Sequence, residues 1–206
     1  MKKSLLLLLC LPFFLSGCAS LDLNDYVSER RSYIYLGEGG NYTVKAESGE
    51  REYPYATDGY ACDTSALFEV TITCAEHEKN LTISFSVDGK RYGGELSYDS
   101  VREEYSYSCG VAVNAESVVF VVGETSVTAE RVNAEDKTSD VLHAVAESEK
   151  DIFDSLTKGN AFLGEIYVRL IYDEGCYYYV GVADRDGHTH SYLTDESGKL
   201  LAKRLD

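Results

Sequence analysis

The sequence predicts a mainly β protein of the α+β class, in which an N-terminal antiparallel β-sandwich is followed by one helix packed on a small antiparallel sheet. Three observations lead to this prediction. Short runs of alternating apolar and polar residues, separated by turn dipeptides, extend over residues 33–132. The hydrophobic period changes once, to helical spacing, within 138–156. Alternating runs return after Gly159 and continue almost to the last residue, Asp206.

The sandwich domain is predicted over 33–132, a length typical of immunoglobulin-like domains. Within it, Phe68, Val70 and Ile72 share one face of a strand, and Asp88-Gly89 is a dipeptide favoured in two-residue hairpin turns. The chain contains no Trp, so the Cys-Trp-Cys signature of true immunoglobulin domains is missing. The predicted strands, each bounded by turn residues, are 33–36, 42–46, 67–74, 81–87, 92–98, 105–113, 117–122 and 125–131.

A second domain, 138–206, is predicted to hold the helix and a β-meander. Thr138, Ser139 and Asp140 supply N-cap candidates and an acidic first turn, and Gly159 is a good C-cap residue. The apolar residues at helical spacing are Val141, Leu142, Val145, Ile152, Phe153 and Leu156. The strands of the meander are predicted at 166–172, 178–182, 188–194 and 199–203. The charged, turn-like segment 133–136 is the predicted boundary between the two domains.

The first eighteen residues have the three parts of an export signal. Lys2 and Lys3 form a basic start, an apolar run covers 5–15, and Ser16-Gly17-Cys18 ends the segment. The apolar run is too short to span a bilayer, which needs about twenty such residues. The end of this segment resembles the lipobox of bacterial lipoproteins. The resemblance implies a signal peptide over 1–17, a lipid on Cys18 and a lipidated tether over 18–32.

That resemblance also implies a location. The lipid on Cys18 would hold the protein on the bacterial cell membrane or outer membrane, facing away from the cytoplasm. The formal net charge is −16, with 35 acidic and 19 basic residues. Such a charge repels nucleic acid and anionic lipid, so neither is an expected partner.

The C-terminal third of the chain resembles the PepSY-like modules of bacterial secreted proteins. The matching parts are the helix over 139–156, the tyrosine-rich strand over 177–183 with its Asp-Gly turn, and the closing segment 194–201. The resemblance implies a binding or inhibitory module that contacts a protease, and it transfers no catalytic residue.

Four cysteines follow the leader and Cys18: Cys62, Cys74, Cys109 and Cys176. An even number outside the cytoplasm favours disulfides, and four cysteines allow three pairings. We predict pairs of Cys62 with Cys74 and of Cys109 with Cys176, the second joining the two domains. Free buried thiols are the alternative. No two of these cysteines have the close spacing of a zinc knuckle, so no metal site is predicted from them.

Two histidines are candidate metal ligands. His188 and His190 share a face of a predicted strand and could bind a divalent cation together with Asp184 or Asp186. Two ligands do not make a site, and a plain hairpin turn at Asp186-Gly187 explains the same residues. We therefore predict no metal site.

No catalytic motif is present in the sequence: it has no Gly-x-Ser-x-Gly elbow, no His-Glu-x-x-His helix and no phosphate-binding glycine loop. The sequence therefore predicts a non-enzymatic protein without a cofactor. The leading interpretation is a membrane-anchored lipoprotein with a binding or structural role and an envelope protein as a possible partner. One alternative is a PepSY-like inhibitor of an envelope protease. Another is a small hydrolase that uses a pair of carboxylates, which leaves no fixed sequence spacing.

These alternatives predict different surfaces. A cleft lined by convergent acidic side chains with raised pKa values would favour the hydrolase. A flat, exposed tyrosine face, to which the run 177–179 could contribute, would favour a binding module.

Overall fold

The computed structural model describes residues 21–206. The predicted signal peptide, the lipid-bearing Cys18 and the start of the tether lie outside the described residues. The described chain is mainly β, as predicted, with fifteen strands and two α-helices. A short 3-10 helix, η1 (Leu23–Tyr26), precedes them.

Nine strands make up the N-terminal part: β1 (Val27–Gly39), β2 (Tyr42–Glu52), β3 (Thr64–Cys74), β4 (Thr82–Val87), β5 (Lys90–Glu95), β6 (Ser97–Asp99), β7 (Glu104–Cys109), β8 (Ser117–Val122) and β9 (Thr125–Arg131). The hairpin predicted at Asp88-Gly89 is present, because β4 pairs with β5, and β1 pairs with β2 in another hairpin. Asp88 and Gly89 both have positive φ, +51° and +77°, the conformation that a two-residue type I′ turn requires.

The C-terminal part begins with α1 (Thr138–Ser148) and α2 (Lys150–Ser155), followed by the small hairpin β10 (Thr157–Lys158) and β11 (Ala161–Phe162). The predicted meander then follows as β12 (Gly164–Tyr172), β13 (Cys176–Asp184), β14 (Thr189–Asp195) and β15 (Leu200–Leu205). Consecutive strands of this meander are antiparallel neighbours.

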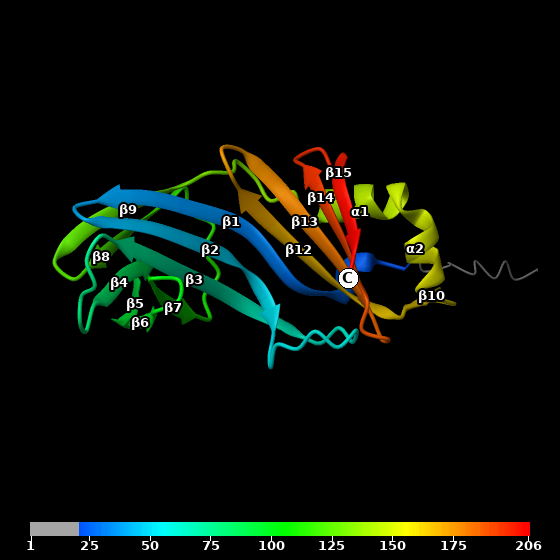
Figure 1. Ribbon diagram of the computed structural model, residues 1–206, viewed down its shortest axis with the longest axis horizontal. Coiled ribbons are helices and arrows are strands. Elements are labelled where there is room, and N and C mark those ends of the chain that lie inside the picture. The colour runs from blue at the N-terminus through cyan, green and yellow to red at the C-terminus, as the bar shows by residue number, and fades with distance from the viewer. Residues whose placement is uncertain (1–20) are drawn as a thin grey trace, which may run out of the picture.

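Thirteen strands belong to one sheet. Its main path runs β15-β14-β13-β12-β1-β2-β3-β7-β6 (Figure 1). Strand β9 pairs with the far part of β1, β8 with β9, β4 with β8 and β5 with β4, so the N-terminal strands curl into a nearly barrel-like arrangement. A separate two-sheet sandwich is not confirmed. Strand spacing predicted where most strands lie, although β1 and β2 are much longer than the predicted 33–36 and 42–46 and the predicted strand 92–98 is divided into β5 and β6. It carried no information about which edges pair.

Strand β1 joins the two parts of the molecule. Its beginning, from Val27 to Arg31, pairs in parallel with β12, whereas Tyr35 and Leu36 pair with β9. The register between β1 and β2 shifts between Arg31 and Tyr33, which marks a β-bulge. Bulges bend and twist a strand. Here the bend lies between the part of β1 that pairs with β12 and the part that pairs with β9.

The tether predicted over 18–32 differs from the structure, because residues 27–32 form the first half of β1. This segment contains little apolar alternation, so its sequence pattern does not predict a strand. Its polar residues are nevertheless buried: Glu29 is 2 % exposed and Arg31 is 7 % exposed. Opposite charges that pair with each other allow burial without an apolar pattern.

Two hydrophobic cores lie on this sheet. The first fills the barrel-like part and contains Phe68, Phe85 and Phe120, whose rings contact one another. The second lies between the helices and strands β12–β14 and contains Phe153. Strand β1 contributes to both, with Tyr35 in the first core and Ile34 in the second. Adjacent residues of a strand point to opposite faces, so one strand can serve two cores.

The predicted helix over 138–156 is divided at Glu149, whose φ of −112° and ψ of +35° are not helical. Thr138 does not form the N-cap. It is the first helical residue, and its amide donates to the Asp136 side chain. The predicted C-cap, Gly159, instead turns the β10–β11 hairpin with a φ of +63°. Five of the six predicted apolar positions, all except the half-buried Ile152, pack in the second core.

Candidate functional site

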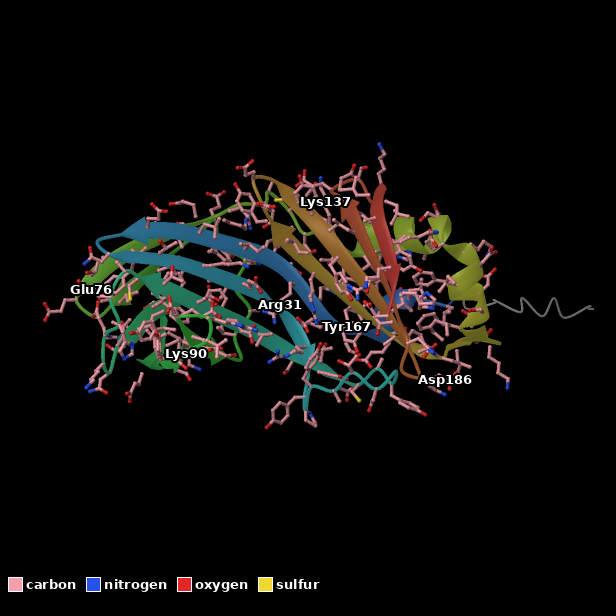
Figure 2. The ribbon with its side chains drawn as sticks, viewed as in Figure 1. Arg31, Glu76, Lys90, Lys137, Tyr167 and Asp186 are labelled. Carbon is pink, nitrogen blue, oxygen red and sulfur yellow. The ribbon has the colours of Figure 1, made fainter. Side chains whose placement is uncertain are left out.

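A groove of about 450 Å³ lies where the barrel-like part meets the C-terminal strands. Strand β1 runs through the middle of this region, and Figure 2 shows Arg31 of β1 close to Tyr167 of β12 there. The lining residues come from β1, β2, β12 and two loops: Glu29, Arg31, Lys45, Glu47, Arg51, Tyr55, Arg102, Arg169, Leu170 and Ile171. The groove thus depends on segments from both halves of the sequence.

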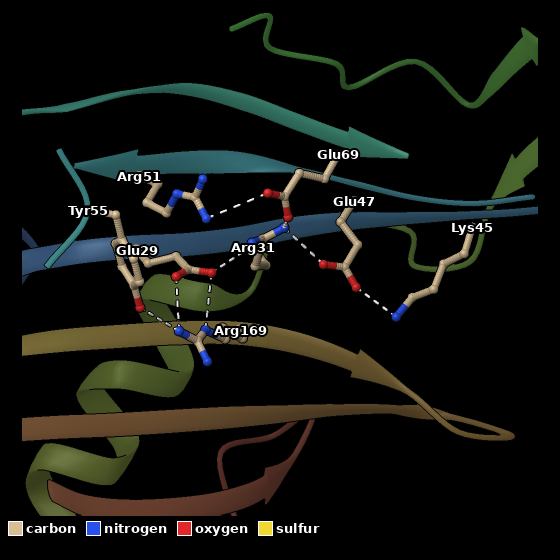
Figure 3. Close-up of polar contacts among 8 residues, drawn as sticks. All are labelled: Glu29, Arg31, Lys45, Glu47, Arg51, Tyr55, Glu69 and Arg169. Atoms are coloured by element: carbon tan, nitrogen blue, oxygen red, sulfur yellow. Dashed lines mark hydrogen bonds and ion pairs between the residues drawn. The ribbon is translucent and has the colours of Figure 1, made fainter. Parts of the chain in front are cut away.

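The floor of the groove is a buried ion cluster centred on Glu29 (Figure 3). Its Oε1 accepts from Nε of Arg31 at 2.7 Å and from Nε of Arg169 at 3.1 Å, and its Oε2 accepts from Nη2 of Arg169 at 2.9 Å. The parallel pairing of β1 with β12 places Arg31 directly opposite Arg169. Burial disfavours the charged form of Glu29, but the charges of Arg169 and Arg31 outweigh it and lower the pKa of Glu29.

The other side of Arg31 contacts two carboxylates on the neighbouring strands. Its Nη1 lies 3.0 Å from Glu47 on β2 and 2.5 Å from Glu69 on β3. Glu47 also pairs with Lys45 at 2.7 Å, and Glu69 lies 3.6 Å from Nη1 of Arg51. A chain of alternating charges therefore crosses four strands of the sheet.

Tyrosine rings hold the arginines of the groove in place. The Arg169 guanidinium lies 5.6 Å from the ring centres of both Tyr167 and Tyr179, and its Nη2 donates to the Tyr55 hydroxyl at 2.9 Å. Arg51 stacks on the Tyr55 ring at 5.0 Å. Contacts of this kind are favourable for guanidinium groups and restrict their motion.

The lining is basic although the protein is acidic. Five of the ten lining residues carry a positive charge, and only Glu29 and Glu47 carry a negative one. The whole chain, in contrast, has a net charge of −16. Fixed arginines suit recognition of a carboxylate or phosphate group.

A second polar cluster lies beside the groove, beneath the loop that connects β2 to β3. Glu165 is 0 % exposed and Glu52 is 3 % exposed. Glu165 accepts from the amides of Asp58 and Gly59, at 3.2 and 2.9 Å, and Glu52 accepts from the amide of Ala56 at 3.0 Å. The two buried carboxylates therefore fasten this loop to the sheet.

Each carboxylate of this second cluster keeps one buried oxygen, Oε2 of Glu52 and Oε1 of Glu165, that has no hydrogen-bond partner within residues 21–206. Burial raises the pKa of Glu165, and the negative charge of Glu52 acts in the same direction. Burial and the neighbouring Glu165 also raise the pKa of Tyr167. Glu165 therefore keeps its proton more readily than an ordinary glutamate.

The predicted disulfides are not formed: Cys62, Cys74, Cys109 and Cys176 are all free thiols in the structure. Cys62 lies in the loop before β3, and Cys74 ends that strand after eleven extended residues. At about 3.3 Å per residue they are roughly 30 Å apart, whereas bridged Cα atoms lie within about 7 Å. Cys109 packs against the first core and Cys176 against the second, so the other predicted pair is wrong for a similar reason.

Asp186 and Gly187 form a turn between β13 and β14, as the simpler interpretation predicted. The Asp184 side chain accepts from the amides of Asp186 and His188, both at 2.9 Å. His188 Nδ1 lies 3.2 Å from the same carboxylate, and His190 is in β14. Within the described chain, no group of three or more His, Cys, Asp or Glu residues is placed to hold a metal ion.

Of the tyrosine run 177–179, Tyr178 is buried in the second core and Tyr179 faces Arg169 of the candidate site. Sequence reasoning missed the central residues Glu29, Arg31 and Arg169. Charged residues recurring at every second position, as in Glu29-Arg-Arg31 and Lys45-Ala-Glu47, were an available signal, because such residues share a strand face.

Comparison of the chain with protein-family models, curated proteins and solved structures found no match. A search of residues 21–206 for a helix long and apolar enough to cross a membrane also found none.

Proposed function

We propose that this protein is a lipid-anchored, extracytoplasmic binding protein whose ligand occupies the arginine-lined groove, and that it is not an enzyme. The observation that carries the proposal is the groove itself. Its charged side chains are fixed by hydrogen bonds and tyrosine contacts before any ligand arrives. A site ordered in advance loses less conformational entropy on binding than a flexible one.

The proposed location rests on the sequence of the leader. A basic start, an apolar run and Ser16-Gly17-Cys18 support export followed by lipidation at Cys18. The cell membrane and the outer membrane are both possible carriers of the anchor. The lipid would be the contact with the membrane, because the net charge of −16 opposes adsorption of the protein surface to anionic lipid.

The groove favours a binding role over a purely structural one. Its volume of about 450 Å³ lies within the range of small-molecule sites, roughly 300 to 1,000 Å³. Ile171 and Tyr55, which are both exposed, add apolar surface beside the charged floor. An envelope protein that inserts one side chain or a chain terminus would use the same surface. If the chain is a PepSY-like inhibitor, its protease partner would bind there, since β12 of the meander carries Arg169.

A small carboxylate-dependent hydrolase is the second candidate, favoured by the neighbouring buried carboxylates Glu52 and Glu165. The raised pKa of Glu165 is what a general acid needs. However, Glu165 has no exposed surface while the loop bearing Asp58 and Gly59 covers it. Hydrolysis would therefore require that loop to open, which ranks this candidate below binding.

The binding proposal can be tested by filling the groove. Ile171 is exposed at its edge, so Ile171→Trp should occupy part of the groove without disturbing either core. Val119→Trp is the matched control, because Val119 is exposed on β8 and does not line the groove. A library of envelope metabolites and peptides would be screened by thermal shift on the full chain in a neutral detergent.

We expect at least one compound to stabilise the wild type and the Val119→Trp variant but not Ile171→Trp. Ligand that binds only the native state raises stability by about 2.7 kcal/mol at a hundred times its Kd, which such a screen detects readily. A compound that stabilises all three proteins equally binds elsewhere. If every stabilising compound behaves in that way, the groove is not the binding site.

A further inference from the structure

The arginines of the groove retain hydrogen-bond donors that the protein does not use. Arg31 donates through Nε and Nη1, and Arg169 donates through Nε and Nη2. Among the described residues, no partner contacts Nη2 of Arg31 or Nη1 of Arg169. Arg51 lies 3.6 Å from its nearest carboxylate oxygen, on Glu69, which is beyond a good hydrogen bond.

These unused donors gather on one face. Arg31 and Arg169 are opposite each other on adjacent strands, and both contact Glu29 (Figure 3). Arg51 is opposite Glu29 on the other neighbour of β1. Three guanidinium groups therefore surround one carboxylate, and that carboxylate has both oxygens engaged by Arg31 and Arg169.

The acidic residues around the groove only partly compensate these arginines. Glu47 and Glu69 share a single nitrogen of Arg31, and Glu47 also contacts Lys45. Arg102, which lines the groove from the loop between β6 and β7, is paired with Glu104 at 3.4 Å and is largely exposed. An anionic group entering the groove would meet N–H donors from several sides and one carboxylate, Glu47, that competes with it.

We infer that the groove binds the carboxylate or phosphate group of a small soluble ligand, held chiefly by Arg51 and the free edges of Arg31 and Arg169. The inference rests on the proposed function and names the ligand class of that site. The planar guanidinium fork matches the geometry of both groups. Tyr55 and Ile171 would contact the apolar body of the ligand.

A soluble ligand is favoured over an anionic lipid headgroup by the charge of the rest of the surface. The chain has 35 acidic and 19 basic residues, and five of the basic ones line this groove. A flat anionic membrane would have to approach the surrounding acidic surface as well, whereas a small molecule enters the groove alone.

The test uses succinate and inorganic phosphate as probes, with succinamide as the uncharged counterpart of succinate. Binding to the full chain in a neutral detergent is measured by calorimetry and by the NMR signals of the arginine Nε–H groups. We expect both anions to bind and to shift the signals of the groove arginines, and succinamide to do neither. Raising the ionic strength should weaken binding.

Three variants locate the site. Arg51→Gln should weaken anion binding at least tenfold, because it removes a charge-assisted donor. Arg91→Gln is the matched control, since Arg91 lies on β5 and contacts Ser84 away from the groove. Glu47→Gln should tighten binding severalfold, because it removes the competing carboxylate. If Arg51→Gln fails to fold, Arg102→Gln, whose side chain is mostly solvent-exposed, should weaken binding twofold to threefold.

Equal affinity for succinate and succinamide would overturn the inference, as would equal affinities of Arg51→Gln and Arg91→Gln for the anions. Vesicles of phosphatidylglycerol and phosphatidylcholine test whether the ligand is a lipid headgroup. Arg51-dependent binding to these vesicles in preference to the soluble probes would show that the ligand is a lipid headgroup, contrary to the inference. If a neutral compound binds the wild type but not Ile171→Trp, the proposed binding function holds. The inference that the ligand is an anion then fails.

Discussion

Two buried glutamates on the same sheet have opposite protonation behaviour, and their neighbours explain the difference. Glu29 contacts two arginines, so burial is outweighed and its pKa is lowered. Glu165 contacts backbone amides and lies near another carboxylate, Glu52, so burial dominates and its pKa is raised. Removing a partner from a buried ion cluster costs about 3 to 5 kcal/mol, so Glu29 holds the charged floor of the groove together.

Glu165→Gln should change the pH dependence of stability. The folded state holds the Glu165 proton more strongly than the unfolded chain, whose glutamates titrate near pH 4.3. The contribution of Glu165 to the free energy of unfolding is therefore fully present below that pH. It falls as the pH rises toward the pKa of Glu165 in the folded state. Each unit of difference between the folded and unfolded pKa values corresponds to a loss of about 1.4 kcal/mol in the free energy of unfolding. The Gln variant keeps an acceptor for Gly59 and loses this dependence.

Urea unfolding of both proteins between pH 4 and pH 8 would measure the effect. The wild type should lose stability relative to Glu165→Gln as the pH rises. Glu38→Gln, at an exposed position, controls for the loss of one carboxylate. A constant difference between wild type and Glu165→Gln over this range would mean that folding does not raise the pKa of Glu165.

At the scale of elements, regular hydrophobic alternation was sufficient to predict strands. The bounds predicted for β8 and β9 coincide with the observed ones, and the meander β12–β15 was predicted in order. The beginning of β1 was not predicted, because its buried residues are charged and pair across strands. Glu29 and Arg169 are 140 positions apart, so no local pattern could indicate that they meet.

The candidate site was harder to predict than the fold for the same reason. Its residues come from three strands and two loops, and the parallel contact of β1 with β12 brings them together. Parallel pairing between distant segments leaves no turn signature in the sequence. The cysteine prediction failed similarly, because an even count gave no information on where β3 would separate Cys62 from Cys74.

Phe153→Ala should test whether the two cores unfold separately. Phe153 is buried in the second core against Phe162, at 5.9 Å between ring centres. Its truncation should cost about 3 to 5 kcal/mol. Hydrogen exchange should then show lost protection in α1 and β12–β14, with β3, β4 and β8 protected, because the aromatic contacts of those strands lie within the first core.

Phe85→Ala provides the reciprocal variant, since Phe85 is buried in the first core on β4. It should give the opposite regional pattern. If both variants lose protection evenly along the sheet, the shared strand β1 makes the molecule a single cooperative unit. The division into domains at 33–132 and 138–206 would then have to be abandoned.

At the scale of the whole molecule, the continuous sheet places the groove near the middle of an elongated protein, where β1 and β12 meet (Figure 1). The first described element is η1, whose end leads directly into β1. The proposed lipid on Cys18 would therefore lie only a few residues from the folded part. At about 3.5 Å per residue, the link from Cys18 to Leu23 reaches at most roughly 20 Å, which would keep the molecule close to the membrane.

Cys18→Ala should abolish lipidation and release the protein from the membrane. Only a cysteine supplies the sulfur that receives the diacylglyceryl group implied by the lipobox, and each buried CH₂ of an acyl chain contributes about 0.8 kcal/mol to anchoring. Bacterial cells expressing the full chain would be labelled with a fatty-acid probe and fractionated. We expect the probe in the wild type and not in the variant, and most of the variant outside the membrane fraction.

Cys62→Ala is the matched control, because Cys62 is an exposed free thiol in the folded part and should not affect the anchor. It should incorporate the probe as the wild type does. Equal incorporation in Cys18→Ala and the wild type would show that another residue carries the lipid. Absence of the probe from the wild type would remove the lipid anchor from the proposed function, while the groove and its ligand could still be tested on the same protein.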